Sequence, residues 1–136
     1  MPRFFRRSAP ARTVPQLRTR LMVSPLEDRV TPATFTVSNA LDSGTGSLRD
    51  AVTNANAVAG NDTIQFDTTF FATPQTITLA SGLSLTSDVT IQGTTARNVV
   101  ISGNNAFRIF TVAGTSPVVM NDITLQNGRG TNGGGV

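Results

Sequence analysis

The side chains that could do chemistry in this sequence are few, and they lie in its second half. Carboxylates can bind calcium, and a basic side chain can accept a proton from a substrate. The candidates of these two types are Asp88, Asp122, Arg97, Arg108 and Arg129. The chain has no cysteine and no histidine. This excludes disulfides, thiolate nucleophiles, zinc sites built on these residues and serine–histidine triads.

Two glycine-rich segments have some likeness to phosphate-binding loops. The first, Gly44-Thr45-Gly46-Ser47, lacks the Gly-Lys-Ser/Thr ending of such a loop, so we expect a tight turn there. The second, Gly133-Gly134-Gly135, suggests a nucleotide loop only when its place in the sequence is ignored. We therefore assign no catalytic, cofactor-binding or metal-ligating residue, and we expect no cofactor.

Length and composition are typical of one globular domain. The chain has 136 residues, of which 38% are apolar, and it contains 12 glycines. No apolar run approaches the roughly 18 residues that a membrane-spanning helix needs. We therefore expect no membrane span.

Charge divides the chain into a basic arm and a mildly acidic body. All 11 basic residues are arginines. Residues 1–33 hold seven of them against two acidic residues, a net charge of +5, whereas residues 34–136 hold four against six aspartates, a net charge of −2. Five prolines interrupt residues 1–33, and we expect a disordered arm there. The body lacks the basic face of a nucleic-acid-binding domain, so no nucleic-acid partner is expected.

The arm has the basic start of an export signal but not its apolar part. Arg6-Arg7 is similar to a twin-arginine signal, yet the longest apolar piece after Arg20 is Leu21-Met22-Val23. An ordinary secretion signal is therefore not visible, and the export route stays open.

Beyond residue 33 the sequence alternates between apolar and polar residues with a period of two. This pattern, rich in β-branched residues and broken by Gly, Asn, Ser and Pro, indicates short strands with one buried face. The predicted strands carry the apolar pairs Phe35/Val37, Ile64/Phe66, Ile77/Leu79, Leu83/Leu85, Val89/Ile91, Val99/Ile101, Phe110/Val112, Val118/Met120 and Ile123/Leu125.

One segment has the period of a helix instead. Leu48, Ala51, Val52 and Ala55 have the spacing of a single apolar stripe, which predicts an amphipathic helix over about 46–58 and no other helix. Ser47 can cap its first turn, and Asp50 could complete a capping box.

The predicted strands repeat along the chain. Val99 and Ile101 match Ile123 and Leu125 at an offset of 24, and the pair Ile77/Leu79 lies 22 residues before Val99/Ile101. A repeat of 20–30 residues with three short strands is typical of a parallel β-helix, in which Asn104, Asn121 and Asn127 would fit the corners. An antiparallel sandwich is the alternative, but only Asn127-Gly128 has the sequence of a tight hairpin.

Several segments, in this order, resemble the N-terminal region of bacterial cell-surface proteins with a right-handed parallel β-helix. These proteins have a pectin-lyase-like fold and share repeats with polymorphic outer membrane proteins. The resemblance covers about residues 26–136. It rests on Leu26-Glu27-Asp28-Arg29, Pro32-Ala33, Thr34-Phe35-Thr36-Val37, Asp42-Ser43-Gly44-Thr45-Gly46-Ser47-Leu48-Arg49-Asp50-Ala51-Val52, Asp62-Thr63-Ile64-Gln65-Phe66, Thr76-Ile77-Thr78-Leu79, Val99-Val100-Ile101-Ser102-Gly103-Asn104-Asn105 and Asn132-Gly133-Gly134-Gly135-Val136.

The resemblance implies an organisation in three parts. Residues 1–33 would be an arm with a candidate sorting signature, residues 34–62 an N-terminal cap made of a strand and the helix, and residues 63–136 the β-helix coils. It also implies export and a place at the cell surface or outside the cell. Only about two coils are present, so we expect a truncated N-terminal piece of a longer protein.

Polysaccharide lyases of the same fold group use clustered aspartates with calcium and a basic residue. Asp88 and Asp122 are 34 residues apart, which is not a whole number of coils, so we expect solvated corner aspartates instead. Arg108 is expected on the outer face beside Phe107 and Phe110. Of the adjacent Phe70 and Phe71, we expect one to be a buried loop anchor.

The function we expect is therefore non-enzymatic: an exported or cell-surface structural or adhesive β-helix protein, with cell-surface glycans or other surface proteins as partners. The N-terminal part of a polysaccharide-degrading, pectate-lyase-like β-helix enzyme is the alternative, and an unexported remnant without function is a third.

Overall fold

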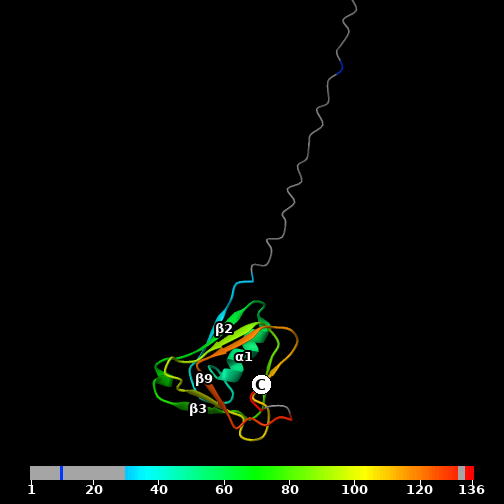
Figure 1. Cartoon of the computed structure of the whole chain (residues 1–136). Helices are drawn as coiled ribbons and strands as arrows, with labels where there is room; N and C mark the ends of the chain where they lie inside the picture. The colour runs from blue at the N-terminus through cyan, green and yellow to red at the C-terminus, as the bar shows by residue number, and fades with distance from the viewer. Residues whose placement is uncertain (1–9, 11–29, 132–133) are drawn as a thin grey trace, which may run out of the picture.

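The computed structural model describes residues 10, 30–131 and 134–136 (Figure 1). Within this part the chain is mostly β structure, with parallel sheets and one short α-helix. Apart from Pro10 and residues 30–33, the predicted arm lies outside the described residues, as do Arg6-Arg7 and Leu26–Arg29.

Each predicted apolar pair lies in or beside a strand. The strands are β1 (Thr34–Val37), β2 (Asp62–Phe66), β3 (Gln75–Thr78), β4 (Leu83–Leu85), β5 (Val89–Gln92), β6 (Val99–Ser102), β7 (Phe110–Val112), β8 (Val118–Asn121) and β9 (Ile123–Gln126). They form three sheets, with the orders β1-β2-β5-β8, β3-β6-β9 and β4-β7. From β2 onward, the chain visits these three sheets in turn and then returns to the first.

Every strand pair among the described residues is parallel, which contradicts the antiparallel sandwich. Val99 pairs with Ile123 and Ile101 with Leu125, so the predicted offset of 24 is confirmed. Parallel strands cannot be joined by tight hairpins, and each needs a long return path. The intervening strands of the other two sheets form that path.

The offset of 22 predicted for Ile77/Leu79 is wrong. Ile77 pairs with Ile101, 24 residues later, and Leu79 lies just beyond β3, where its N–H donates to the Ser102 carbonyl over 3.0 Å. Registers that differ by two residues place the same side chains on the same face of a strand. The alternation of apolar residues therefore could not distinguish them.

Helix α1 (Leu48–Ala57) confirms the predicted helix, with ends slightly inside the expected range. The Ser47 hydroxyl accepts from the Asp50 N–H at 3.2 Å, as predicted for the cap. The capping box is modified, because Asp50 Oδ2 accepts from the Gly46 N–H rather than from the Ser47 N–H. Leu48, Val52 and Ala55 are buried, and α1 contacts β1, β2 and β4 (Figure 1).

The inward side chains of the three sheets form one apolar core together with the buried face of α1. The pair Phe110/Val112 departs from the prediction, because Phe110 is fully buried whereas Val112 is 37% exposed. Phe110 therefore belongs to the core and does not lie beside Arg108 on the outer face. Arg108 itself is half-buried.

Several residues in the bends beside the strands adopt the left-handed backbone region. Asn104 and Asn127 have φ of 54° and 52°, as expected for corner asparagines. The prediction for Asn121 is wrong: it ends β8, and Asp122 takes the left-handed conformation with φ of 53°. Asp tolerates this region nearly as well as Asn, so composition alone could not choose between neighbours.

A 3-10 turn, η1 (Phe70–Ala72), contradicts the prediction of no other helix. Asp67 Oδ1 accepts from the N–H groups of Thr69 and Phe70 and begins this turn. Phe71 is buried and packs edge-on against Phe66, with ring centroids 5.1 Å apart. Phe70 is 40% exposed, so one ring of the pair is the buried anchor, as expected.

Candidate functional site

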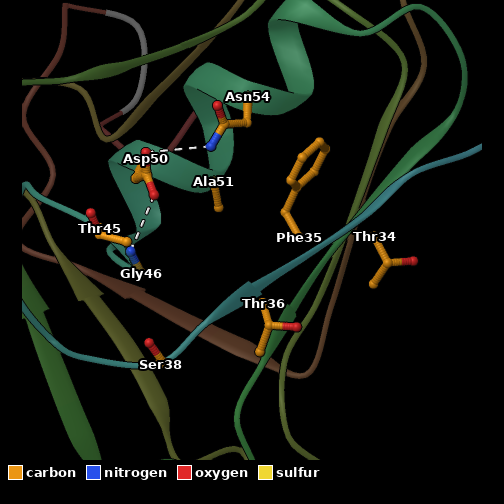
Figure 2. Close-up of a pocket in the computed structure, with 9 residues that line it drawn as sticks. All are labelled: Thr34, Phe35, Thr36, Ser38, Thr45, Gly46, Asp50, Ala51 and Asn54. Carbon is orange, nitrogen blue, oxygen red and sulfur yellow. Dashed lines mark hydrogen bonds between the residues drawn. The ribbon is translucent and has the colours of Figure 1, made fainter.

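A groove of about 360 Å³ lies between β1 and α1. Hydroxyl, amide, carboxylate and backbone groups line it, together with Phe35 and Ala51 as the apolar surface (Figure 2). The polar side chains that line it come from Thr34, Thr36, Ser38, Thr45, Asp50 and Asn54. A groove of this composition can bind a neutral, hydrogen-bonding ligand.

Strand β1 forms one wall of the groove, and the direction of its backbone N–H and C=O groups alternates along the strand. The carbonyls of Ala33 and Val37 accept from strand β2 and the residue that follows it, so residues 33, 35 and 37 direct their backbone groups toward β2. Backbone groups alternate along a strand, so those of Thr34 and Thr36 point away from β2. Both threonine side chains are exposed, and Phe35 is half-buried.

Helix α1 contributes the opposite wall. Asp50 Oδ2 accepts from the Gly46 N–H at 3.1 Å, and its Oδ1 accepts from Asn54 Nδ2 at 3.3 Å (Figure 2). The turn before the helix is closed by glycines, because Gly44 and Gly46 have φ of 94° and 77°. The expected tight turn at residues 44–47 is therefore confirmed. These bonds hold the carboxylate in place as a hydrogen-bond acceptor at the groove.

A second hollow, of about 290 Å³, adjoins the groove at Thr36. It lies over Gln65 and the turn of Asp67, Thr68 and Thr69. The N–H groups of Phe70 and Thr69 donate to Asp67 and lower the pKa of its carboxyl from 3.8. The hollow therefore presents an ionised carboxylate at neutral pH beside hydroxyl and amide groups.

Amide side chains connect neighbouring strands along the outer face of the first sheet. Gln65 Nε2 donates to Thr36 Oγ1 at 3.1 Å, and Asn121 Nδ2 donates to Gln92 Oε1 at 3.1 Å. Gln92 Nε2 also donates to Asp122 Oδ2 at 3.2 Å. The result is a column of polar, largely uncharged groups that runs across the strands from the groove.

The structure does not bring the two candidate aspartates together. Asp88 directly precedes β5 and Asp122 directly follows β8, and these paired strands run parallel, so the two residues lie at opposite ends of the pair. Asp122 also faces Arg97, with an N–O distance of 3.7 Å. In the part of the chain that the structure describes, no three acidic, histidine or cysteine side chains lie close enough to hold a metal ion.

The backbone groups of Arg129 and of the glycine-rich segment at residues 133–135, the remaining candidates, take part in hydrogen bonds of the fold where the structure describes them. The Arg129 N–H donates to the Phe107 carbonyl at 2.9 Å. The carbonyls of Gly134 and Gly135 accept from the N–H groups of Ile109 and Phe110, so these glycines run alongside β7. Gly133 lies outside the described residues.

Sequence reasoning missed an ion pair near the groove. Arg49 Nη2 lies 2.7 Å from Asp42 Oδ1 and donates over the same distance to the Ser81 carbonyl. The hydrogen bond from Arg49 lowers the pKa of the Asp42 carboxyl. The pair connects α1 to the loop between β3 and β4. The only sequence signal for this ion pair was the position of Arg49 near the start of the helix, seven residues after Asp42.

A buried carboxylate was also missed. Asp62 is fully buried at the start of β2, and its Oδ1 accepts from the Ala33 N–H at 2.8 Å. Its Oδ2 is buried without a hydrogen-bond partner. Asp62 therefore anchors the segment that enters β1, at the cost of one unsatisfied oxygen.

No helix in residues 30–131 is long and apolar enough to cross a membrane. No protein-family model, no curated protein and no solved structure matches this chain.

Proposed function

We propose that this chain is a non-enzymatic structural and adhesive element of an exported or cell-surface protein, built as a right-handed parallel β-helix. The order in which the chain visits its three parallel sheets supports a β-helix, because each circuit adds one strand to each sheet. Right-handed crossovers are the rule for parallel strands. In this proposal α1 covers the first circuit and residues 63–136 form the coils.

The observation that carries the adhesive part is the polar surface around Thr36, which is rich in hydroxyl and amide groups and contains the carboxylates of Asp50 and Asp67. The groove, the adjoining hollow and the column of Gln65, Gln92 and Asn121 form one surface that donates and accepts hydrogen bonds. Glycans carry many hydroxyl groups that donate and accept hydrogen bonds, so they match such a surface. Half-buried Phe35 adds an apolar surface on which a sugar ring can pack.

The positions of the candidate catalytic residues favour binding over catalysis. A calcium-dependent lyase needs several carboxylates that converge on one ion. Asp88 and Asp122 lie at opposite ends of a strand pair, and Asp122 bonds Gln92. The pectate-lyase-like alternative is therefore the weaker proposal for this chain.

Glycan binding by the purified chain tests the adhesive proposal. A glycan array identifies a ligand, and titration calorimetry then compares Asn54→Ala and Thr36→Ala with the unchanged chain. We expect each substitution to weaken binding about tenfold, the effect of losing one or two hydrogen bonds. Thr111→Ala, at an exposed position of β7, is the matched control and should bind normally.

Two results would overturn the proposal. One is equal binding by all variants, because the ligand would then lie elsewhere. The other is release of unsaturated uronides from pectin by the chain in the presence of calcium, because the chain would then be a lyase. Surface display is tested separately, by protease digestion of intact cells that express the tagged protein.

A further inference from the structure

The hollow beside the groove contains a carboxylate that the fold holds in one orientation without using all of its acceptor positions. The hollow, of about 290 Å³, is lined by Thr36, Gln65, Phe66, Asp67, Thr68 and Thr69. The N–H groups of Thr69 and Phe70 both donate to Asp67 Oδ1, at 2.7 Å and 3.1 Å. Because a carboxylate has about four acceptor positions on its two oxygens, Asp67 Oδ2 keeps lone pairs for a donor in the hollow.

The side chains around Asp67 are uncharged groups that can form hydrogen bonds. Gln65 Nε2 donates to Thr36 Oγ1 at 3.1 Å, and a hydroxyl that accepts a hydrogen bond can still donate one. Gln65, Thr68 and Thr69 are exposed. The described residues that line the hollow therefore present several neutral hydrogen-bonding groups and one negative charge.

No basic side chain lies among the described residues that line the groove or the hollow. Arg49 directly precedes the groove residue Asp50, but its guanidinium pairs with Asp42 over 2.7 Å. Asp50 adds a second carboxylate, and each of its oxygens already accepts a hydrogen bond, one from the Gly46 N–H and one from Asn54 Nδ2 (Figure 2). The two cavities therefore favour a positively charged group over a negatively charged one.

We propose that the hollow binds the protonated amino group of an amino sugar, with Asp67 Oδ2 as its acceptor, while the groove binds a neighbouring neutral sugar of the same glycan. This inference rests on the proposed glycan binding and names the class of glycan. Because Thr36 lines both cavities, one chain of sugars can lie across them. A hydrogen bond from an ammonium group to a carboxylate is roughly twice as strong as a neutral one. Uronic acids and sulfated sugars would place a negative charge beside Asp67 and bind more weakly.

Three sugar oligomers of equal length test the preference for an amino group: a glucosamine oligomer with free amines, its neutral N-acetylated counterpart and an anionic galacturonate oligomer. Titration calorimetry of the full chain is done at about pH 5.5, where the sugar amines are protonated. Asp67 is ionised at this pH, because the N–H groups of Phe70 and Thr69 lower its pKa from 3.8. The glucosamine oligomer should bind about three- to tenfold more tightly than the N-acetylated one, and added salt should reduce this ratio.

A change of charge at Asp67 identifies the acceptor. Asp67→Asn removes the charge but keeps an oxygen for the N–H groups of Thr69 and Phe70, so the turn should persist. This variant should bind the amine and N-acetylated oligomers with about equal affinity. Asp88→Asn is the matched control, because it makes the same change of charge at a residue that lines neither cavity, and it should keep the preference. Both variants retain the basic residues 1–33, so any attraction of an oligomer to that segment is the same in each.

The outcomes separate this inference from the proposed function. Equal binding of the amine and N-acetylated oligomers by the unchanged chain, weakened for both by Thr36→Ala, would overturn the inference and leave glycan binding in place. An equal loss of the preference in Asp67→Asn and Asp88→Asn would also overturn it, because the preference would then reflect overall charge. Absence of binding to any glycan would overturn both proposals. Circular dichroism melts establish that each variant is folded.

Discussion

The Arg49 guanidinium and the Asp42 carboxylate lie 2.7 Å apart and join the start of helix α1 to the loop between β3 and β4. Asp42 Oδ1 also accepts from the Ala80 N–H at 2.9 Å. Arg49 donates to the carbonyl of Ser81 as well. The pair therefore holds α1 over the end of the core.

This ion pair predicts a dependence of stability on pH. The pKa of Asp42 is lower in the folded chain than its ordinary value of 3.8. Its contribution is therefore complete above the unfolded-state pKa and is lost as the pH falls through the folded-state pKa. We expect Asp42→Asn to lower the free energy of unfolding at pH 7 by about 1 kcal/mol, as is typical of partly exposed pairs.

Urea unfolding between pH 7 and pH 2 checks this prediction. The difference between Asp42→Asn and the unchanged chain should shrink as the pH falls below about 4, because Asp42 becomes protonated and then is neutral, as asparagine is at every pH. A difference that stays constant down to pH 2 would show that the loss is not electrostatic. Arg49→Lys keeps the charge but cannot donate in the same forked geometry, so it should retain only part of the contribution of the pair to stability.

Removal of the helix cap should lower the stability of the chain, although Ser47 lies just before α1 and no residue of the helix itself is changed. The buried Ser47 hydroxyl accepts from the Asp50 N–H, so Ser47→Ala should cost about 1 kcal/mol. Thr53→Ala in the exposed part of α1 is the control, and it should change stability by less than about 0.5 kcal/mol. Thermal unfolding followed by circular dichroism measures both. Equal effects would argue against the cap.

Because α1 packs on the core, truncation of its buried leucine should lower stability more than removal of the cap does. Leu48 is completely buried, and Leu48→Ala should lower the free energy of unfolding by about 2–5 kcal/mol. The loss should also expose the covered end of the core and increase the binding of a hydrophobic dye. A variant with normal stability and no added dye binding would contradict the role of α1 as a cover.

The buried carboxylate of Asp62 predicts different outcomes for two substitutions. Asp62→Asn keeps an acceptor for the Ala33 N–H and removes a buried charge, so stability should be unchanged or higher. Asp62→Ala leaves the Ala33 N–H without its partner and should cost about 1–3 kcal/mol. Urea unfolding of both variants at pH 7 is the measurement. An equal loss in both would mean that the charge itself is required.

Close backbone packing at one corner predicts that Gly93 cannot be replaced by a larger residue without a loss of stability. A Cβ at Gly93 would overlap the backbone carbonyl of Asp122 in the neighbouring strand connection. Gly93→Ala should therefore cost about 1–3 kcal/mol, as overpacking does. Gly135→Ala is the control, because its Cβ would make only ordinary contact with Leu125 at 3.5 Å. Normal stability of the Gly93 variant would contradict the close packing.

Local sequence determined where the strands and the helix lie. Each of the nine apolar pairs marks a strand because side chains alternate between the two faces of extended backbone. The stripe of Leu48, Val52 and Ala55 marks α1 for the corresponding reason, the period of 3.6 residues. These signals are contained in a few neighbouring residues, so they need no knowledge of the rest of the chain.

Tertiary structure decided the registers and the candidate site. The register of Ile77 with Ile101 depends on the length of the path between them, because a shift of two residues leaves the alternation unchanged. The groove joins Thr34 and Thr36 of β1 to Asp50 and Asn54 of α1. None of these residues carries a motif of its own. They line one groove only because burial of the apolar face of α1 holds its polar side chains against the outer edge of β1.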